Sequence, residues 1–440
     1  MYVRPSMLVI GGGITGLAAA WKLNSLGCDV KVWEASSRVG GQVVTADVDG
    51  QKFDTGASKV PVIPGPLFDL IEELGLTHEL SEVKPDELKI HRDERVLQLP
   101  KGLTPQGLTS FSSALFSPVL SWPLKLRAAQ EPLHVRRPTG YDISVADFIS
   151  QRFGFRLCDQ LIAPVTWGIL GSDPSEQSLE CFSTSMARLR RENKSILLDS
   201  LVNRKSRTVS MVKMNGGWSR LIDRLLVDVE VEVCKRVDRL TLTSDNQIVV
   251  READEEVTVN GIVFAAPDSE AVQLFAGIVR NNDVLESSLG RNHDTVLSIF
   301  EIEGDLVDRF GIDYILQDHI HNNVIRLANV LGLTRDRRYS LLRVVGICES
   351  NSTPSSVDEV IERMEKYAER LTGKFARLVD FTHLPMSVVN ENVGHRNKVQ
   401  QLRSILPANV VVAGSYFDGG GLNSSVASAW KAAAQLYSVI

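Results

Sequence analysis

The most constraining feature of this chain is a strand, a glycine-rich turn and a helix that follow one another within its first 25 residues. An apolar strand is expected at residues 8–10, directly before the sequence Gly-Gly-Gly-Ile-Thr-Gly at residues 11–16. Three alanines at positions 18–20 favour a slim helix after the turn. A second apolar strand then ends in an acidic residue, Glu34. This order predicts a βαβ unit in a parallel, Rossmann-type sheet.

Each glycine of the G-x-G-x-x-G pattern has its own physical reason. Gly11 permits a tight turn, Gly13 lets the backbone approach a pyrophosphate, and Gly16 lets the helix lie close to the strands. The helix N-terminus then presents free N–H groups to the phosphates. Glu34 lies 18 residues beyond Gly16, where a carboxylate binds a ribose hydroxyl and repels a 2′-phosphate. The pattern therefore predicts a dinucleotide site and disfavours NADP.

Two further features extend this fingerprint. Arg38-Val39-Gly40-Gly41 follows the acid and indicates FAD among the dinucleotides. Near the other end, residues 409–414 predict a strand, residues 415–423 form a glycine-rich loop, and residues 425–439 predict a small-residue helix. A second strand, loop and helix of this kind implies that the chain returns to the same site and offers more backbone N–H groups there.

Composition excludes several other classes of protein. The chain has 440 residues, enough for two or three lobes, and a net charge of −6 with no long basic block, so nucleic acid is not expected as a partner. The five cysteines lack C-x-x-C or Cys/His zinc spacing, which predicts no metal site and fits a reducing, cytoplasmic setting. The first strand begins within ten residues, so no leader peptide is expected.

Membrane contact is left open by one stretch. No apolar run reaches the roughly 20 residues of a membrane span. Residues 108–124 are nonetheless apolar, aromatic and uncharged, although Pro118 and Pro123 interrupt them. They fit either a packed segment of a helical lobe, which is the favoured interpretation, or a peripheral contact with a membrane interface.

Together these motifs resemble those of the flavin-containing amine oxidase superfamily, and within it most closely those of the porphyrinogen oxidases. The likeness is carried by residues 34–41, 53–58, 162–174, 214–218, 393–395 and 413–422. The chain departs from that pattern at Gln42, where the family often has a basic residue, at Ala429, and before Gly394, where a Pro-Gln-Tyr is missing.

The resemblance implies FAD as the cofactor and an α/β fold. This fold has a Rossmann-type FAD-binding domain of the GR2, amine-oxidase type, an α+β substrate domain and a helical lobe. The expected FAD-binding domain is discontinuous, at residues 1–65, 206–290 and 391–440. The expected substrate domain takes residues 66–100 and 291–390, and the helical lobe residues 101–205. The implied cofactor-binding residues are Gly11, Gly13, Ile14, Thr15, Gly16, Glu34, Ala35, Arg38, Gly41, Gln42, Gly56, Ala57, Ser58, Val237, Gly414, Ser415, Gly421, Leu422 and Val426.

The expected activity is that of an FAD-dependent oxidase or dehydrogenase. A hydride would pass from a bulky, largely apolar small molecule, of the protoporphyrinogen or coproporphyrinogen kind, to flavin N5, and oxygen or another acceptor would reoxidise the flavin. The flavin carries this chemistry, so no catalytic side chain is identified. Two alternatives stay open, an oxidase of amines or amino-acid-derived compounds and a non-redox flavin mutase. The absence of lysine between Lys235 and Lys366 argues against a standard amine oxidase. The oligomeric state is not indicated.

Five further side chains admit a functional and a structural interpretation. His319 and His321 share a strand face and fit a solvated pair better than a metal site. His395 approaches the flavin or makes a structural hydrogen bond. Asp418 caps the last helix or binds a ribityl hydroxyl. Arg343, in an apolar strand, either binds a substrate carboxylate or reaches solvent from an edge strand, the favoured interpretation.

Overall fold

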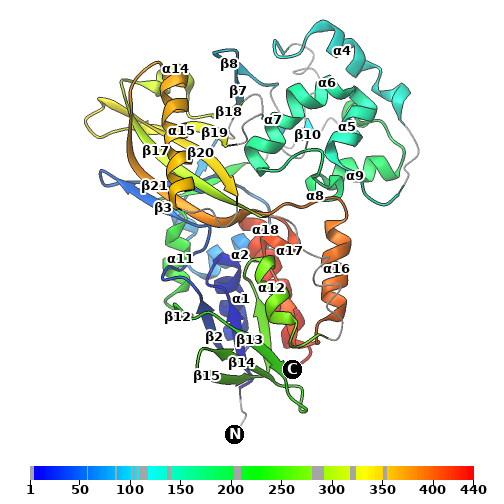
Figure 1. Ribbon diagram of the computed structural model, residues 1–440, viewed down its shortest axis with the longest axis vertical. Coiled ribbons are helices and arrows are strands. Elements are labelled where there is room, and N and C mark those ends of the chain that lie inside the picture. The colour runs from blue at the N-terminus through cyan, green and yellow to red at the C-terminus, as the bar shows by residue number, and fades with distance from the viewer. Residues whose placement is uncertain are drawn as a thin grey trace.

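The structure is a computed structural model in which the Rossmann-type region occupies one end and two further bodies, a sheet and a helical lobe, lie side by side at the other (Figure 1). It describes residues 4–56, 58–84, 87–100, 103–104, 107–108, 117–135, 140–202, 210–279, 292–317, 324–349 and 354–440. Ala57, His319, His321 and most of the apolar stretch before residue 117 lie outside the described residues.

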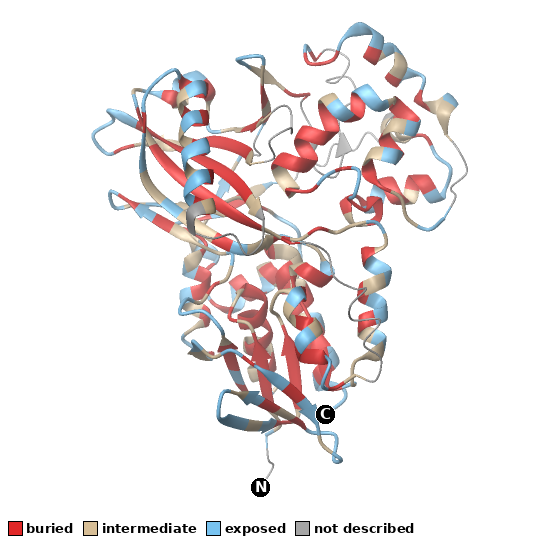
Figure 2. Ribbon diagram, in the orientation of Figure 1, coloured by how far each residue is buried: buried red, intermediate tan, exposed pale blue. Residues whose placement is uncertain are grey.

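A five-stranded parallel sheet forms the centre of the Rossmann-type region. Its order is β12-β2-β1-β16-β22, so the strand after the fingerprint lies beside the first. The strands are β1 (Ser6–Ile10), β2 (Asp29–Glu34), β12 (Glu230–Val233), β16 (Gly261–Phe264) and β22 (Val410–Val412). β16 and β22 are buried along their whole length, as expected of parallel strands covered on both faces. Figure 2 shows buried residues concentrated at the centre of the Rossmann-type region.

Two helices from opposite ends of the chain cover one face of this sheet. α1 (Ile14–Ser25) packs along α18 (Leu422–Tyr437), and small residues of both helices are fully buried between them. Trp21 and Trp430 stack at a ring separation of 6.2 Å. The other face is covered by α12 (Asp268–Phe275) and by the antiparallel sheet of β13 (Arg239–Leu242), β14 (Ile248–Glu252) and β15 (Glu255–Val259). This is the Rossmann-type architecture that the fingerprint predicts.

A seven-stranded mixed sheet forms the second body. Its strand order is β21-β17-β20-β19-β18-β7-β8. Its strands are β7 (Leu88–Arg92), β8 (Arg95–Gln98), β17 (His293–Glu303), β18 (Tyr314–Gln317), β19 (Ile325–Leu333), β20 (Tyr339–Glu349) and β21 (Ala376–Val388). The amphipathic helix α15 (Pro354–Thr372) buries Met364, Tyr367 and Ala368 against one face. The opposite face turns its apolar side chains toward the third body.

The third body is a helical lobe. Its elements are α4 (Trp122–Ala129), α5 (Val145–Phe153), α6 (Phe155–Leu157), α7 (Ala163–Val165), α8 (Leu179–Phe182), α9 (Thr184–Arg191) and α10 (Ile196–Val202). Two π-helical turns, Cys158–Ile162 and Thr166–Leu170, flank α7 and Pro164. Proline cannot donate the backbone hydrogen bond of a regular helix, which explains the widened turns at this point. Within the described residues, no helix is both long and apolar enough to cross a membrane.

The helix that begins at residue 66 packs on the other side of the domain boundary that was expected there. α2 (Pro66–Glu73) buries Leu67, Leu70 and Ile71 in the same core as α1 and α18, so this helix belongs with the Rossmann-type region. Conversely, the hairpin of β3 (Thr45–Val48) and β4 (Gln51–Asp54) packs onto β17 and β20 of the seven-stranded sheet. The short strands β5 (Val60–Pro61), β6 (Leu80–Val83) and β11 (Met211–Met214) join these parts in a small sheet. The other expected boundaries stay predictions.

Candidate functional site

The glycine turn after β1 has the close contacts that its sequence predicts. A Cβ atom at Gly11, which has φ +108°, would lie 2.7 Å from the carbonyl oxygen of Ala265. A Cβ atom at Gly16 would lie 1.9 Å from the carbonyl oxygen of Gly11. A larger residue at Gly11 would collide with the segment that follows β16, and a larger residue at Gly16 would push the helix away from the turn. These contacts agree with the tight turn expected at Gly11 and the close helix expected at Gly16, and the cofactor roles of both residues stay predictions.

Two glycine backbones face one another at the N-terminus of α1. Gly13, the N-cap residue, pairs with Gly40 in an isolated parallel bridge, and the amide of Gly40 donates to the carbonyl of Gly12 over 2.9 Å. A Cβ atom at Gly41 would lie 3.1 Å from Gly13 Cα. The helix start, Ile14 and Thr15 included, carries no side-chain cap. A phosphate can therefore reach its N–H groups.

The acid at the end of β2 is held by backbone groups. One oxygen of Glu34 accepts the amide of Gly12 at 2.7 Å, and the other accepts the amide and hydroxyl of Ser36 at 2.8 and 2.7 Å. Ala35 follows on the same exposed turn. Val237, expected near an adenine, is buried on the segment after β12, where Lys235 donates its amide to the carbonyl of Glu34. The carboxylate is thus fixed at the strand end, where a ribose can reach it.

Arg38 fastens the turn that follows. Its guanidinium group donates to the carbonyl oxygens of Val39 (3.2 Å) and Gly41 (2.5 Å) and remains exposed. The side chain of Gln42, expected along a pyrophosphate, forms a hydrogen bond with Tyr416. Tyr416 lies on the C-terminal loop, so Gln42 links the two halves of the candidate site in the structure.

The C-terminal loop is locked by a chain of polar contacts. It contains α17 (Ser415–Asp418), with Gly414 at φ +112° before it and Gly421 at φ +93° as the N-cap of α18. The amide of Gly414 donates to Ser428 Oγ at 2.8 Å, and that hydroxyl donates to Asp418 at 2.5 Å. Arg403 also donates to Asp418, at 2.7 Å. Asp418 therefore pairs with an arginine and a serine, and its expected contact with a ribityl hydroxyl stays a prediction.

This loop meets the N-terminal fingerprint. A Cβ atom at Gly414 would lie 3.2 Å from Thr15 Oγ1 in the first turn of α1. Leu422 and Val426, both expected near the flavin, are buried in the core that α1 and α18 share. The two glycine-rich loops and their two uncapped helix N-termini therefore lie at one place, as the sequence predicts.

A buried arginine holds the segment that contains Gly56. Arg343 is 2 % exposed on β20. Its Nε donates to Asn329 at 2.8 Å, and its Nη1 donates to the carbonyls of Asp54, Thr55 and Gly56 at 3.0 Å each. The prediction that it reaches solvent from an edge strand was wrong, because β20 lies inside the sheet between β17 and β19. The three backbone carbonyls that it binds are 287 to 289 residues away in sequence, so no local pattern identifies them.

The segment around Gly56 is also fixed from its other side. Asp54 accepts the hydroxyl of Thr45 and the amide of Trp218, both at 2.8 Å. Burial nevertheless raises the pKa of Asp54 above its usual value. The indole of Trp218 donates to the carbonyl of Ser58 at 3.3 Å, which explains why the Gly-Gly-Trp motif at residues 216–218 is needed here.

Two titratable residues lie beside the C-terminal loop. His395 is 5 % exposed, and its ring forms a hydrogen bond with the backbone of Tyr416. Burial lowers the pKa of His395, so the neutral ring is favoured, and its Nε2 has no partner among the described residues. Glu391 Oε1 would lie 3.8 Å from a Cβ atom at Gly419, and burial raises the pKa of this carboxyl group. Sequence reasoning missed Glu391, which occupies the segment where the Pro-Gln-Tyr pattern is absent.

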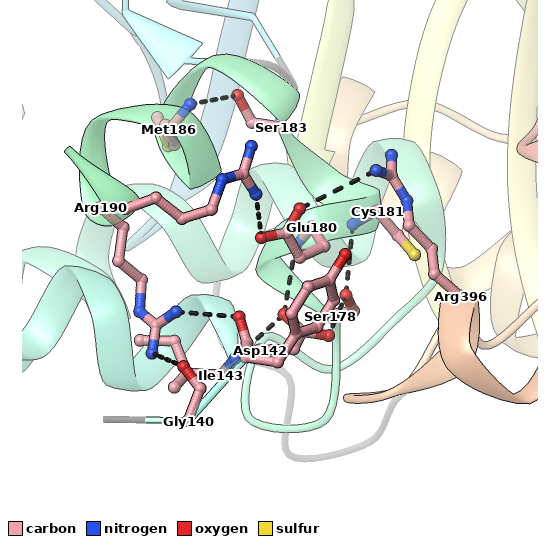
Figure 3. A network of polar contacts seen from close by, with 12 residues as sticks. Gly140, Asp142, Ile143, Ser178, Glu180, Cys181, Ser183, Met186, Arg190 and Arg396 are labelled. Atoms are coloured by element: carbon pink, nitrogen blue, oxygen red, sulfur yellow. Dashed lines mark hydrogen bonds and ion pairs between the residues drawn. The ribbon is translucent and has the colours of Figure 1, made fainter. Parts of the chain in front are cut away.

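The helical lobe is attached to the start of α16 (His395–Ile405) by a polar network (Figure 3). Asp142 accepts the hydroxyl of Ser178 at 2.6 Å and the amide of Gly394 at 3.0 Å. Glu180 pairs with Arg191 within the lobe and lies 3.8 Å from Arg396 on α16. The network fixes the lobe against the segment that precedes α16.

A second buried arginine joins the lobe to the sheet. Arg326 lies at a β-bulge of β19 and donates to the carbonyls of Trp167 (3.3 Å) and Ile169 (2.7 Å) on the second π-helical turn. Burial lowers the pKa of Arg326 to about 10, so it stays charged at neutral pH. A bulge turns a side chain out of the strand's regular alternation, which lets Arg326 reach the lobe.

Comparison with known proteins agrees with this geometry. Residues 14–276 match the model of a family described as flavin containing amine oxidoreductase. The chain belongs to this family. A coproporphyrinogen III oxidase of Bacillus subtilis (strain 168) is 24 % identical over 95 % of each chain. Among solved structures, a protein from Exiguobacterium sp. 255-15 that is provisionally assigned as a protoporphyrinogen oxidase has a TM-score of 0.84 and 20 % identity over the whole of both chains. A reduced UDP-galactopyranose mutase has a TM-score of 0.72 and 14 % identity, over 99 % of this chain and 96 % of its own.

Membership of the flavin containing amine oxidoreductase family makes this chain an FAD-dependent oxidoreductase with the Rossmann-type fold described above. The residues present fit FAD. The glycine cradle of Gly13 and Gly41 leaves space that a Cβ atom would fill, and two uncapped helix N-termini offer N–H groups to an anion. Which residue binds which part of the cofactor is a matter of proposal, and this holds for Ser58, Ser415 and Gly421 as well.

Proposed function

We propose that this protein is a porphyrinogen oxidase, which removes hydride from a bulky, largely apolar porphyrinogen. The likeness to a coproporphyrinogen III oxidase along 95 % of both chains carries this proposal. When bound, FAD supplies the flavin ring that accepts the hydride, and oxygen or another acceptor must then take up the electrons. The protein's own residues bind and orient the substrate and keep water out.

The face of the seven-stranded sheet toward the helical lobe supports an apolar substrate. Leu297, Leu327 and Val345 lie on this face and share a core with Ile162 and Val165 of the lobe. Val345 follows two residues after Arg343, which holds the segment at Gly56, so it points to the same side of the sheet. An apolar wall therefore adjoins the segment expected beside the flavin.

The cofactor-binding roles follow from the same arrangement. We assign Glu34 to the adenosine ribose, the turn at Gly13, Arg38 and Gly41 to the pyrophosphate, and Gly56 to the flavin ring. We assign the N-terminus of α18 at Gly421 and Leu422 to the pyrimidine edge, where its backbone N–H groups would stabilise negative charge as it develops. The side chain of Gln42 forms a hydrogen bond with Tyr416, so we assign Gln42 to the closing of the site.

We also propose that the helical lobe touches a membrane surface. Trp122 and Leu126 lie one turn apart on α4 and are 69 % and 66 % exposed, and Phe155 on α6, which α4 contacts, is 72 % exposed. Lys125 lies between them, with its Nζ 4.9 Å from the centre of the Trp122 ring. Exposed tryptophan and leucine beside lysine favour the interface of an anionic bilayer.

The activity is tested with the purified protein and added FAD. The proposal expects fluorescent porphyrin to form from protoporphyrinogen or coproporphyrinogen, and no turnover of a panel of amines. Turnover of amines alone would replace the proposal with an amine oxidase. Conversion of a nucleotide sugar only after dithionite reduction would replace it with a mutase.

The membrane contact is tested by sedimentation with vesicles that contain an anionic lipid. The double substitution Trp122→Ser and Leu126→Ser is expected to reduce the bound fraction. Phe375→Ser, which removes an apolar side chain that is 73 % exposed next to α15, is the matched control. Equal binding of both variants would contradict the proposal.

A further inference from the structure

We propose that Asp294, Cys348 and His383 form a binding site for a divalent transition metal of the zinc type. One ligand atom from each residue lies within 4.8 Å of the other two. The cluster lies at the end of the seven-stranded sheet, outside the cofactor site described above. It was not expected from the sequence, because its members are at least 35 residues apart and show no zinc-ligand spacing.

Strand register brings the three side chains to one face of the sheet. Asp294 on β17 lies directly opposite Cys348 on the neighbouring strand β20. His383 on β21 lies opposite Val296, which is two residues from Asp294 and therefore on the same face. The three residues thus come from three adjacent strands, which hold their backbones rigidly. A site built on strands is more precise than one built on loops.

A β-bulge completes the arrangement around Asp294. The pairing of β17 with β21 shifts between His293 and Thr295, and Met386 in the bulged segment has φ +48°. Its amide donates to Asp294 Oδ1 at 2.8 Å. The other oxygen, Oδ2, lies 2.9 Å from His383 Nε2. One carboxylate oxygen is therefore oriented by the backbone and the other faces the cluster, as in metal sites whose ligands are held by a second set of hydrogen bonds.

The chemistry of the three ligands selects the class of metal. A thiolate and an imidazole favour zinc over magnesium and calcium, which prefer oxygen ligands. Zinc bonds of 2.0–2.3 Å place tetrahedral ligands about 3.3–3.8 Å apart. The ligand atoms of Asp294, Cys348 and His383 are 2.9 Å to at most 4.8 Å apart, an interval that includes the zinc distances. Small movements of these side chains would therefore bring all three atoms to bonding distance of one ion.

The exposure of the cluster leaves room for a fourth ligand. Asp294 is 2 % exposed, whereas Cys348 is half-buried and the side chain of His383 is 28 % exposed. Solvent therefore reaches the cluster from the side of the histidine, and water fits the fourth position. Sites with three protein ligands and one water are typical of zinc that stays accessible.

The site is tested by metal binding to the full chain with FAD bound. Protein treated with a chelator and dialysed is titrated with zinc chloride against a chromophoric competitor, and separately with cobalt(II). We expect a single tight equivalent and a thiolate-to-cobalt charge-transfer absorption in the near ultraviolet. His383→Gln and Cys348→Ser are each expected to weaken zinc binding by at least about tenfold. Cys348→Ser is also expected to abolish the charge-transfer absorption.

Cys234→Ser, which changes an exposed cysteine directly after β12, is the matched control and should bind zinc like the unchanged chain. If a ligand variant does not fold, alkylation of the unchanged chain replaces it. Zinc should then slow the modification of Cys348 at least tenfold and leave that of Cys234 unchanged. Absence of a stoichiometric site, equal affinity in both ligand variants, or unprotected Cys348 would overturn the proposal. None of these measurements depends on the substrate.

Discussion

Thr15 and Gly414 lie against one another although they are almost 400 residues apart in sequence. A Cβ atom on Gly414 would be 3.2 Å from Thr15 Oγ1 and 3.4 Å from its methyl carbon. Thr15 belongs to the first turn of the helix after the N-terminal glycines, and Gly414 opens the C-terminal loop. The proposed cofactor site is therefore bordered by a direct contact between the two ends of the fold.

Substitution at this contact should loosen the loop. Gly414 has φ +112°, so Gly414→Ala places a side chain against Thr15 in a strained backbone conformation and is expected to destabilise the fold by about 1–3 kcal/mol. FAD should bind more weakly because the loop amides move. Gly420→Ala in the same loop meets no atom within 4 Å and is the control. Urea unfolding and flavin fluorescence measure both effects, and equal behaviour of the two variants would contradict the contact.

Glu34→Gln tests the assignment of this acid. The carboxylate accepts the amides of Gly12 and Ser36, and an amide side chain can accept only one of them. The loss of one such hydrogen bond costs about 1–3 kcal/mol, and we expect the affinity for FAD to fall by at least about tenfold. Glu232→Gln, at the end of the neighbouring strand β12, changes a carboxylate outside the turn and should leave FAD binding unchanged. A larger loss of FAD affinity in Glu232→Gln than in Glu34→Gln, measured by FAD titration, would contradict the assignment.

Arg343→Lys tests the buried arginine. Lysine cannot reproduce the planar group that serves Asn329 and three backbone carbonyls, and each unsatisfied buried acceptor costs about 1–3 kcal/mol. We expect a clear loss of stability and a shift in the absorption spectrum of bound FAD, because Gly56 is no longer held. Arg335→Lys, which removes an exposed contact to Gly50, is the control. An unchanged melting temperature and spectrum for Arg343→Lys would contradict this role.

Burial predicts the reactivity of the cysteines. It raises the pKa of Cys158 and Cys181 to about 11, so almost none of either is thiolate at pH 7.5. Cys234 is exposed. Iodoacetamide should therefore modify Cys234 well before the other two, as peptide mass spectrometry can follow. Labelling of Cys158 at the rate of Cys234 would show that the helical lobe opens.

Glu391 gives a pH dependence with a definite sign. Burial raises its pKa in the folded protein, so the folded state favours the protonated form. The stability from this group is complete below its unfolded pKa of about 4.3 and is lost as the pH rises through the folded pKa. Glu391→Gln should therefore match the unchanged chain near pH 4 and exceed its stability at pH 7.5. Glu176→Gln, nearby and exposed, should show no such gain in urea unfolding.

Local sequence predicts the parts of the site whose contacts are local. Gly11 and Gly16 meet each other within six residues, and the acid at Glu34 reaches Gly12 through one βαβ unit, so spacing alone identifies them. The contacts of Arg343 and Asp418 could not be predicted in this way. The partners of Arg343 depend on which strands are neighbours, and Asp418 meets Arg403 only after α16 packs beside the loop. The Asp294 cluster depends on the register of three strands.

The strands of the Rossmann-type sheet come from both ends of the chain, and this has a consequence for synthesis on the ribosome. β22 and α18 complete this sheet and its core, but they follow β1 by about 400 residues. At 5–20 residues per second, α1 waits roughly 20–80 s for the helix that covers it. During that time its apolar face is exposed to chaperones and to aggregation. FAD can be enclosed only after the last helix has left the exit tunnel, so a supply of cofactor cannot rescue nascent chains that stall before residue 410.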